Sequence, residues 1–598
     1  MRPEAPDEPK TCDGKNDGAR GCNIMFANKL GTPQPFILVR PDARLYADTG
    51  IRDNPRMAAT LIIHVRRILA MGAAGGPQAA SVAVHGRRVY AVGTRRQIER
   101  LRSRRTTVLD LADCVLMPAF TDAHTHFYMW AARPDVVNLV DARSLADALR
   151  RIAAAARQRA PGEWVIARGF DKNHWQQTAH TGARERRGGS EEWFPTAAHL
   201  DAVTGSVPTQ VQSRDGHSVW VNTAAMRAAG ITARTKAPPG GAILRDRRGR
   251  LTGILQENAI SLLPDVASTL TDAQIERALA AGIREFHRHG ITCAHAVEGA
   301  EALRWFGRLH QAGKLGLRIR FAIPSERLDE AIAVGLTNGL GDDMLRICGV
   351  KCFADGSLGS QSAYMFDSYP ARPGYRGVPV CVGRALRDLV CKAAKAGLPC
   401  WVHAIGDRAV HETVEAFAEA RRLERRPLRH RIEHAQCVRP ADVRRMGRLR
   451  IIASMQPCHI VGDIEAAEKH WSNVLRWAYP IRSLHEAGVR LAFGSDVPVE
   501  TFNPIVGLHA AVNRQRLDRT PTGGWQMHQA IGIRDALRAY TVGGAYAAGD
   551  ADSLGRIAPG MLADFAVLSD DPLRIPRERL LDLRVVATVC NGRIVHRA

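Results

Sequence analysis

The sequence predicts an α/β protein, a (β/α)8 TIM-like barrel with a large insertion, plus a small β-sandwich domain built from the N- and C-terminal segments. Two observations lead to this prediction. Short apolar strands alternate with amphipathic helices through the middle of the chain, which is typical of βαβ units around a parallel sheet. Val- and Ile-rich runs separated by turns occur at both ends, which is typical of antiparallel sheet. A chain of 598 residues is long enough for more than one structural unit.

The two ends of the chain differ in character from the middle. Residues 1–57 are rich in Pro, Asp, Gly, Arg and Asn without periodicity, which predicts a disordered extension or a start assigned too far upstream. Residues 58–116 contain ATLIIHVRRILAM and ASVAVHGRRVYAVG, and residues 555–598 contain DFAVLSDDP and VVATVCNGRIVH. We expect these two segments to form one composite β-sandwich.

Residues 117–554 are expected to form the barrel. Strand patterns such as GITCAHAVE, LPCWVHAIGD and VRLAFGSDVP alternate there with helical patterns such as DAQIERALAAGIREFHRHG. A (β/α)8 barrel is the economical closure for this many units, and its chemistry lies at the carboxyl ends of the strands. The interval from about 130 to 270 is too long for one loop, so it predicts an insertion.

Polar residues end several of these apolar runs and are the candidate functional residues. His124 and His126 in TDAHTHFYM are two positions apart, which puts both imidazoles on one face of a strand. Alone, this pair is more simply explained as hydrogen-bonded or surface histidines. Further strand ends, however, carry His403 in WVHAIGD, His434 in RIEHAQ and Asp496 in FGSD. Imidazole and carboxylate ligands suit Zn²⁺, with Fe²⁺, Mn²⁺ or Co²⁺ as alternatives, so the sequence predicts a site for one or two divalent metal ions.

Lys351 is an unusual member of this series, because it lies within the apolar strand pattern ICGVKCFADG. A charged lysine is costly to bury there. A neutral amine can add CO₂ and become a carbamate, an anion able to bridge two metals. The alternative is an ammonium that reaches the barrel rim or pairs with Asp355.

Four further residues are candidates for facing the pocket and orienting substrate. They are His217 in RDGHSVW, Asp355 in FADGS, and Gln456 and His459 in SMQPCH. A structural hydrogen-bonding role is the alternative for each of them.

The ordered set PAFTDAHTH, VKCFADGSLGS, WVHAIGDRAV, HRIEHAQ, FGSDVPVETFNP and PGMLADFAVL resembles the amidohydrolase superfamily (amidohydrolase family 3), and within it the branch of N-substituted formamide deformylases. The resemblance runs from about residue 58 to the end, and Ala119 departs from it where the family usually has Gly. It implies a metal-bearing barrel in which Lys351 is carboxylated. The ligand positions that it implies are His124, His126, His403, His434 and Asp496.

This resemblance implies a metal-dependent amidohydrolase that cleaves a non-peptide C–N bond, of amide or formamide type, with a metal-activated hydroxide. Asp496 is then expected to be the catalytic proton shuttle. One alternative is a catalytically inactive protein of the same fold that binds or regulates. Another is a polyanion-binding protein.

Charge and composition bear on the partners. The formal net charge is +23, but the basic residues are scattered and most simply explained as solvated helical faces. The twelve cysteines form no CxxC pair, which favours a reducing compartment. No apolar run is long enough for a membrane span. We expect a cytoplasmic enzyme with a small-molecule substrate and no specific nucleic-acid or membrane partner; a homodimer is the assembly considered.

Overall fold

The computed structural model describes residues 58–72, 80–132, 136–140, 142, 144–160, 162–172, 175, 194–264 and 270–598. The extension expected over residues 1–57 lies outside the described residues. The described chain forms an eight-stranded sheet, a seven-stranded sheet and a six-stranded sheet.

The eight-stranded sheet is the barrel that the sequence predicts. All of its neighbouring strands run parallel. In spatial order they are β18 (Arg490–Phe493), β17 (Ile452–Met455), β16 (Arg431–His434), β15 (Cys400–Ala404), β14 (Leu345–Phe353), β13 (Arg318–Pro324), β12 (Ile291–Ala296) and β5 (Phe120–Thr125). The backbone N–H of Asp496 donates to the carbonyl oxygen of His124 at 2.8 Å, which joins the ends of the first and last strands. The predicted fold class is therefore confirmed.

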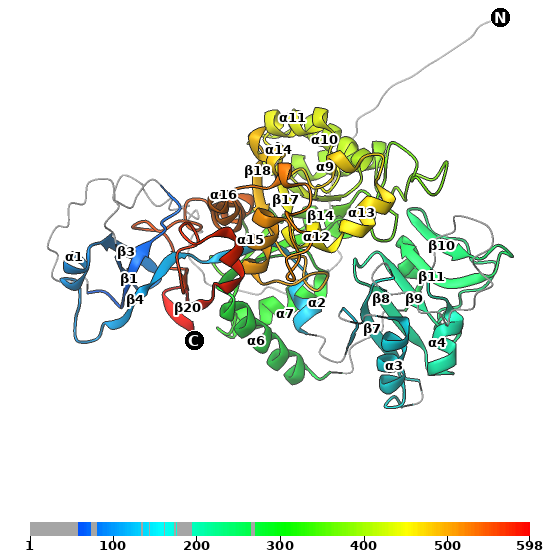
Figure 1. Ribbon diagram of the computed structural model, residues 1–598, viewed down its shortest axis with the longest axis horizontal. Coiled ribbons are helices and arrows are strands. Elements are labelled where there is room, and N and C mark those ends of the chain that lie inside the picture. The colour runs from blue at the N-terminus through cyan, green and yellow to red at the C-terminus, as the bar shows by residue number, and fades with distance from the viewer. Residues whose placement is uncertain are drawn as a thin grey trace, which may run out of the picture. The chain divides into compact units, whose positions relative to one another are not determined.

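Helices cover the outside of the barrel, and Figure 1 shows α9, α10 and α11 beside one another there. The long helix α6 (Asp272–Arg288) shows why these segments are helical. The Thr271 side chain caps its first turn, and Ile275, Leu279 and Phe286 recur at helical spacing on its buried face. The other helices after the strands are α7 (Ala300–Gln311), α8 (Leu328–Ala333), α9 (Gly383–Lys395), α10 (Asp407–Ala420), α11 (Pro440–Leu449), α12 (Pro457–Gly462), α13 (Ile464–His470), α14 (Ile481–Glu486), α15 (Pro504–Asn513), α16 (Ile533–Arg538) and α17 (Gly544–Ala547).

The seven-stranded sheet combines both ends of the described chain (Figure 1). Its order is β21 (Arg593–Arg597), β20 (Val585–Cys590), β19 (Phe565–Leu568), β4 (Thr107–Pro118), β1 (Leu61–Ile68), β2 (Ser81–His85) and β3 (Arg88–Gly93), with α1 (Arg95–Glu99) after β3. The antiparallel pairing of β19 with β4 joins the two segments, and all seven strands belong to one continuous sheet. A buried ion pair ties this sheet to the barrel, because Arg318 of β13 donates to both carboxylate oxygens of Asp564 at 2.8 Å.

The six-stranded sheet lies in the chain between α2 (Phe127–Ala131) and α6. Its order is β10 (Gly241–Arg245), β11 (Leu251–Glu257), β9 (Ser218–Val221), β8 (Thr209–Ser213), β7 (Val165–Phe170) and β6 (Val137–Asn138), with α3 (Leu145–Ala156), α4 (Ala197–Thr204) and α5 (Thr223–Ala228) between strands. Asp215 fastens it to the barrel, because its Oδ2 accepts hydrogen bonds from the hydroxyls of Ser357 at 2.5 Å and Ser360 at 2.7 Å.

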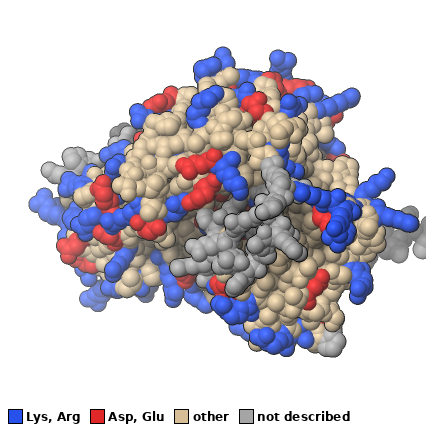
Figure 2. Space-filling view, turned by 45° about the vertical axis from the view of Figure 1, so that its right-hand side comes forward, with Lys and Arg blue, Asp and Glu red and all other residues tan. Residues whose placement is uncertain are grey.

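The surface mixes both signs of charge. Figure 2 shows Lys and Arg side chains spread over one face with Asp and Glu side chains between them. Among the described residues, none of the helices combines the length and apolarity that crossing a bilayer requires.

Candidate metal centre

The candidate ligands lie where barrel strands end. His124 is the fifth residue of β5, His126 is the residue just before α2, His434 ends β16, and Asp496 follows β18 after two residues. The backbone has positive φ angles at His434 (71°) and Asp496 (62°), which is uncommon for residues other than glycine and is often found at functional sites. Gly494 allows the close approach of β18 to β5, since a Cβ there would lie 2.4 Å from the backbone nitrogen of His124.

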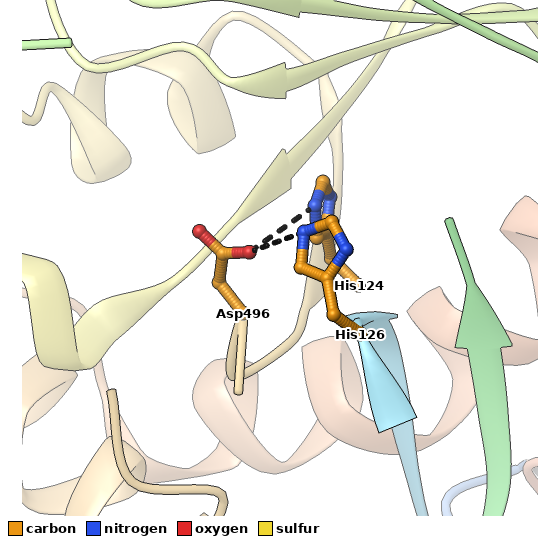
Figure 3. A group of neighbouring side chains, drawn as sticks. All are labelled: His124, His126 and Asp496. Atoms are coloured by element: carbon orange, nitrogen blue, oxygen red, sulfur yellow. Dashed lines mark ion pairs between the residues drawn. The ribbon is translucent and has the colours of Figure 1, made fainter. Parts of the chain in front are cut away.

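The first group of candidate ligands consists of His124, His126 and Asp496 (Figure 3). Oδ1 of Asp496 lies 3.4 Å from Nε2 of His124 and 3.2 Å from Nε2 of His126. The carboxylate therefore faces both imidazoles of the HxH pair.

The second group shares the same carboxylate. Oδ2 of Asp496 lies 3.5 Å from Nε2 of His459 and 3.9 Å from Nδ1 of His434. In each group the candidate ligand atoms lie within 4.8 Å of one another. The rings of His124 and His434 are 4.8 Å apart, so the two groups are adjacent.

The polar atoms of these groups fit a divalent cation. Nε2 of His124, Nε2 of His459 and Nζ of Lys351 are buried and have no hydrogen-bond partner among the described residues. Buried polar atoms without partners are rare in proteins, and a bound cation is one group that can satisfy them. Imidazole nitrogens with a carboxylate oxygen form a donor set that suits Zn²⁺ and similar ions.

Burial sets the charge state of two of the histidine ligands, His124 and His434. It lowers the pKa of His124 to about 4, and it holds the pKa of His434 well below the ordinary value, so both imidazoles are neutral as metal binding requires. Burial acts to raise the pKa of Asp496, but the imidazoles of His124 and His126 outweigh it and hold that pKa well below its usual range. The centre thus presents the neutral nitrogens of His124 and His434 beside one ionised carboxylate.

Lys351 and His403 lie beside the two groups rather than in them. Burial lowers the pKa of the Lys351 amine to about 8, although Glu433 and Asp496 act to raise it. Its Nζ lies 4.5 Å from the centre of the Phe353 ring. His403 donates from Nε2 to the carbonyl oxygen of Gly356 at 3.1 Å, so that nitrogen already has a partner.

One cavity of about 300 Å³ brings the predicted metal-site residues together, and it also reaches His217 in the loop between β8 and β9 of the six-stranded sheet. Met129, Ile260, Phe353 and Val380 give this cavity an apolar wall. The predicted metal-site residues that line it are His124, His126, Lys351, His403, His434 and Asp496.

The four residues predicted to orient substrate fall into different places. His217 lines the cavity, and its Nδ1 donates to Oε2 of Glu257 at 2.8 Å. His459 belongs to the second ligand group, which the sequence did not indicate. Gln456 accepts from Nδ1 of His434 at 2.8 Å, and thereby orients that ring. Asp355 accepts from the backbone N–H groups of residues 364, 405 and 406, so its contacts shape the loops around His403.

Sequence reasoning missed the charged side chains beneath the ligands. Glu433 accepts a hydrogen bond from Nδ1 of His124 at 2.5 Å, and Arg431 forms an ion pair with Glu433. Burial acts to raise the pKa of Glu433, but Arg431 and His124 outweigh it and lower the pKa to about 2. The segment RIEH contained a sign of this pair. Arg431 and Glu433 are two positions apart in a strand, so their side chains point to the same side of the sheet.

Comparison with known proteins places these observations in a family. Residues 107–596 match the sequence model of the amidohydrolase family. The chain is 27% identical to the putative amidohydrolase YtcJ of Bacillus subtilis over 513 residues, which cover 83% of this chain and 92% of that protein. It is also 27% identical to the N-substituted formamide deformylase of Arthrobacter pascens over 538 residues, covering 86% and 94% of the two chains.

A solved structure of a metal-dependent hydrolase is also similar to this chain. The crystal structure of an uncharacterized metal-dependent hydrolase from Pyrococcus horikoshii is similar to this chain with a TM-score of 0.67 and 25% sequence identity. The similarity covers 87% of this chain and 99% of the other.

Proposed function

Because the chain belongs to the amidohydrolase family, we propose that it is a metal-dependent hydrolase of a non-peptide C–N bond in a small amide or formamide. The observation that carries the proposal is the position of Asp496, whose two carboxylate oxygens face two groups of histidines beside a cavity of about 300 Å³. The similarity to the deformylase of Arthrobacter pascens supports the bond type.

The residues proposed to hold the metal are those of the two ligand groups, with Lys351 and His403 beside them. When bound, a divalent cation such as Zn²⁺ lowers the pKa of water and polarises a carbonyl group. Nε2 of His124 and Nε2 of His459 have no hydrogen-bond partner among the described residues. This supports the assignment, because a cation bound at each ligand group would satisfy these nitrogens.

Asp496 is proposed as the general base and acid. Its low pKa keeps it ionised, and its Oδ atoms lie at the cavity wall. It accepts one proton from water as the new C–O bond forms, and it returns that proton to the leaving nitrogen as the C–N bond breaks. The products are an amine and a carboxylic acid, formic acid for a formamide, which releases the second proton of the water as it ionises to the carboxylate.

Lys351 is proposed to be carboxylated. A neutral Nζ attacks CO₂, one proton leaves the nitrogen, and the resulting carbamate carries one negative charge. Nζ has no hydrogen-bond partner among the described residues, and the fall of its pKa from the ordinary lysine value to about 8 increases the fraction of neutral amine that this reaction needs.

His217 is proposed to orient the substrate from the insertion side. Its Nδ1 is held by Glu257, and the ring lies 4.8 Å from the ring of His403. The apolar wall of the cavity favours a substrate with an apolar substituent next to the amide.

The test is a hydrolysis assay with metal control. Protein loaded with Zn²⁺ is offered N-substituted formamides, N-acyl amines and cyclic amides, and amine release is measured before and after dialysis against a chelator. We expect release from at least one class, loss of release after chelation and recovery with Zn²⁺. Metal-loaded, folded protein that releases no amine from any class would instead support the alternative of an inactive binding protein. Activity indifferent to the chelator would contradict a metal-dependent reaction.

A further inference from the structure

A line of buried side chains extends from the candidate metal centre into the barrel interior. His124 Nδ1 contacts Oε2 of Glu433 at 2.5 Å, and Oε1 of Glu433 forms an ion pair with Nε of Arg431. Arg431 Nη1 donates to Nδ1 of His295 at 2.8 Å, and its guanidinium lies 3.4 Å from the ring centre of Trp401. All five side chains are fully buried. They come from β5, β16, β12 and β15, so the line crosses the inside of the barrel.

We propose that Glu433 and Arg431 are positioning residues that fix the tautomer of His124, with the proton on Nδ1 and the lone pair on Nε2 facing the cation. This inference rests on the proposed function, because the cation is the same metal. Neither residue touches substrate, and both act through the imidazole of His124.

The donor and acceptor pattern carries the argument. A neutral imidazole has one N–H donor and one acceptor nitrogen, whereas an ionised carboxylate only accepts. Glu433 therefore requires the proton of His124 on Nδ1. Nε2 is then the acceptor nitrogen, and it is the atom that lies 3.4 Å from Oδ1 of Asp496 without a hydrogen-bond partner in the described chain.

Two other ligand histidines, His434 and His459, have less restrictive partners. Nδ1 of His434 faces the amide of Gln456, and Nδ1 of His459 faces the amide of Gln436. A side-chain amide can turn either its oxygen or its NH₂ towards a ring, so it permits both tautomers. Glu433 permits only one, which gives His124 the most strictly defined tautomer of the three.

Because of Arg431, an amide cannot take over the role of the Glu433 carboxylate in fixing the tautomer of His124. In a Glu433→Gln variant one end of the amide faces Arg431 and the other faces His124. A guanidinium has donors only, so the amide oxygen must face Arg431 and its NH₂ must face Nδ1 of His124. Nδ1 then has to accept, the proton moves to Nε2, and the lone pair for the cation is lost. An isosteric change with no loss of volume thus inverts the tautomer.

Removing the guanidinium should reverse this effect. In a double variant Arg431→Met/Glu433→Gln, nothing holds the amide oxygen away from His124. The amide can turn, accept from Nδ1 and restore the acceptor on Nε2. A residue that only filled space would not produce this recovery.

The experiment measures Zn²⁺ affinity of the metal-free full chain by competition with a coloured chelator. We expect Glu433→Gln to weaken binding about 10–100-fold, which is the usual effect of losing a hydrogen-bond partner of a metal ligand. We expect the double variant to regain most of that loss. The matched control is Glu424→Gln, because Glu424 also accepts from a buried histidine, His430 at 3.0 Å, and from an arginine, but lies away from the centre. This control should leave Zn²⁺ affinity unchanged.

A second measurement uses the unaltered protein, in case Glu433→Gln does not fold. Side-chain ¹⁵N spectra of histidine-labelled metal-free protein report the tautomer of each ring, and the His124 signal is the one absent in a His124→Gln variant. We expect a protonated Nδ1. A proton on Nε2, Zn²⁺ affinity unchanged in Glu433→Gln, or a double variant no better than the single one would each overturn the inference. Neither the Zn²⁺ titration nor the ¹⁵N spectra need a substrate. A protein that shows the expected affinities yet releases no amine would therefore refute the proposed function and leave this inference standing.

Discussion

Oδ2 of Asp496 lies 3.5 Å from Nε2 of His459, a histidine in the short helix that follows the seventh barrel strand. Oδ1 of the same carboxylate faces His124 and His126. One carboxylate therefore lies between two sets of imidazoles, and the contribution of each set can be tested separately.

Replacing His459 by Asn should weaken metal binding at the second group. The variant removes one of three candidate ligand atoms and leaves His124 and His126 in place. We expect the metal content of the purified protein to fall, and Zn²⁺ affinity at that group to fall at least about tenfold. Metal analysis and a Zn²⁺ titration check this. His470→Asn is the control, since His470 is also buried but is not part of either ligand group. Unchanged metal content in the His459 variant would show that this histidine is not a ligand.

Asp496→Asn should reduce both turnover and metal affinity. The amide cannot take a proton from water, and loss of a general base typically lowers rate by about 10²–10⁴-fold. It also removes the negative charge common to the two ligand groups, so both should bind Zn²⁺ more weakly. The comparison is made at saturating Zn²⁺, where the remaining loss of turnover reports the proton transfer alone. Asp407→Asn serves as the control for altering a buried aspartate, because Asp407 pairs with Arg439 outside the ligand groups. Normal turnover in fully loaded Asp496→Asn protein would remove Asp496 from the reaction.

The sequence predicted most of the barrel for a physical reason, and it singled out residues that the structure brings together at the strand ends. Strand ends in a parallel barrel meet at one edge, so residues such as His124, His434 and Asp496 can be grouped by their position after apolar runs. The structure confirms the parallel barrel, and the family match supports the resemblance that the ordered motifs showed.

The sequence did not reveal which side chains contact one another across the barrel. Glu433 and His124 are 309 positions apart, and their contact depends on how far each strand is shifted along its neighbours. Whether His459 faces Asp496 likewise depends on the direction of the helix after β17, which periodicity does not define. Strand-end residues were therefore predictable one by one, whereas the partners that orient them were not.

Lys351→Ala should lower activity, and a small carboxylate should restore part of it. The variant removes the amine that is proposed to carry the carbamate, and the space left beside the cavity can admit a carboxylate such as propionate. We expect a loss of about 10–100-fold in activity at fixed Zn²⁺, with recovery on adding propionate. Lys392→Ala is the control, because Lys392 is exposed on α9 and pairs with Asp329. Full activity in the Lys351 variant without any added carboxylate would exclude the carbamate.

His217 should make the stability of the protein depend on pH above neutrality. Burial acts to lower the pKa of His217, but Glu257 and Asp215 outweigh it and raise the pKa to about 9. The unfolded chain has an ordinary histidine pKa of about 6.5, so the folded state binds the proton more tightly. The stabilisation from this proton is fully present below pH of about 6.5 and is lost as pH rises through about 9. The free energy of unfolding should therefore decline over this interval by about 1–3 kcal/mol more in the unaltered protein than in His217→Gln.

Thermal or denaturant unfolding at several pH values and constant Zn²⁺ measures this difference, since metal binding itself shifts stability. The matched control is His310→Gln, because His310 also faces a carboxylate, Asp342 at 3.1 Å, but the two side chains are 35% and 55% exposed. Solvent screens such a pair, so its removal should leave the slope of stability against pH close to that of the unaltered protein. Equal slopes in the unaltered protein and in His217→Gln would mean that His217 does not hold its proton in the folded state, and that the hydrogen bond to Glu257 is one of a neutral ring. The two outcomes differ in what the cavity offers to a substrate, because a protonated ring presents a second N–H donor on Nε2 whereas a neutral ring presents an acceptor there.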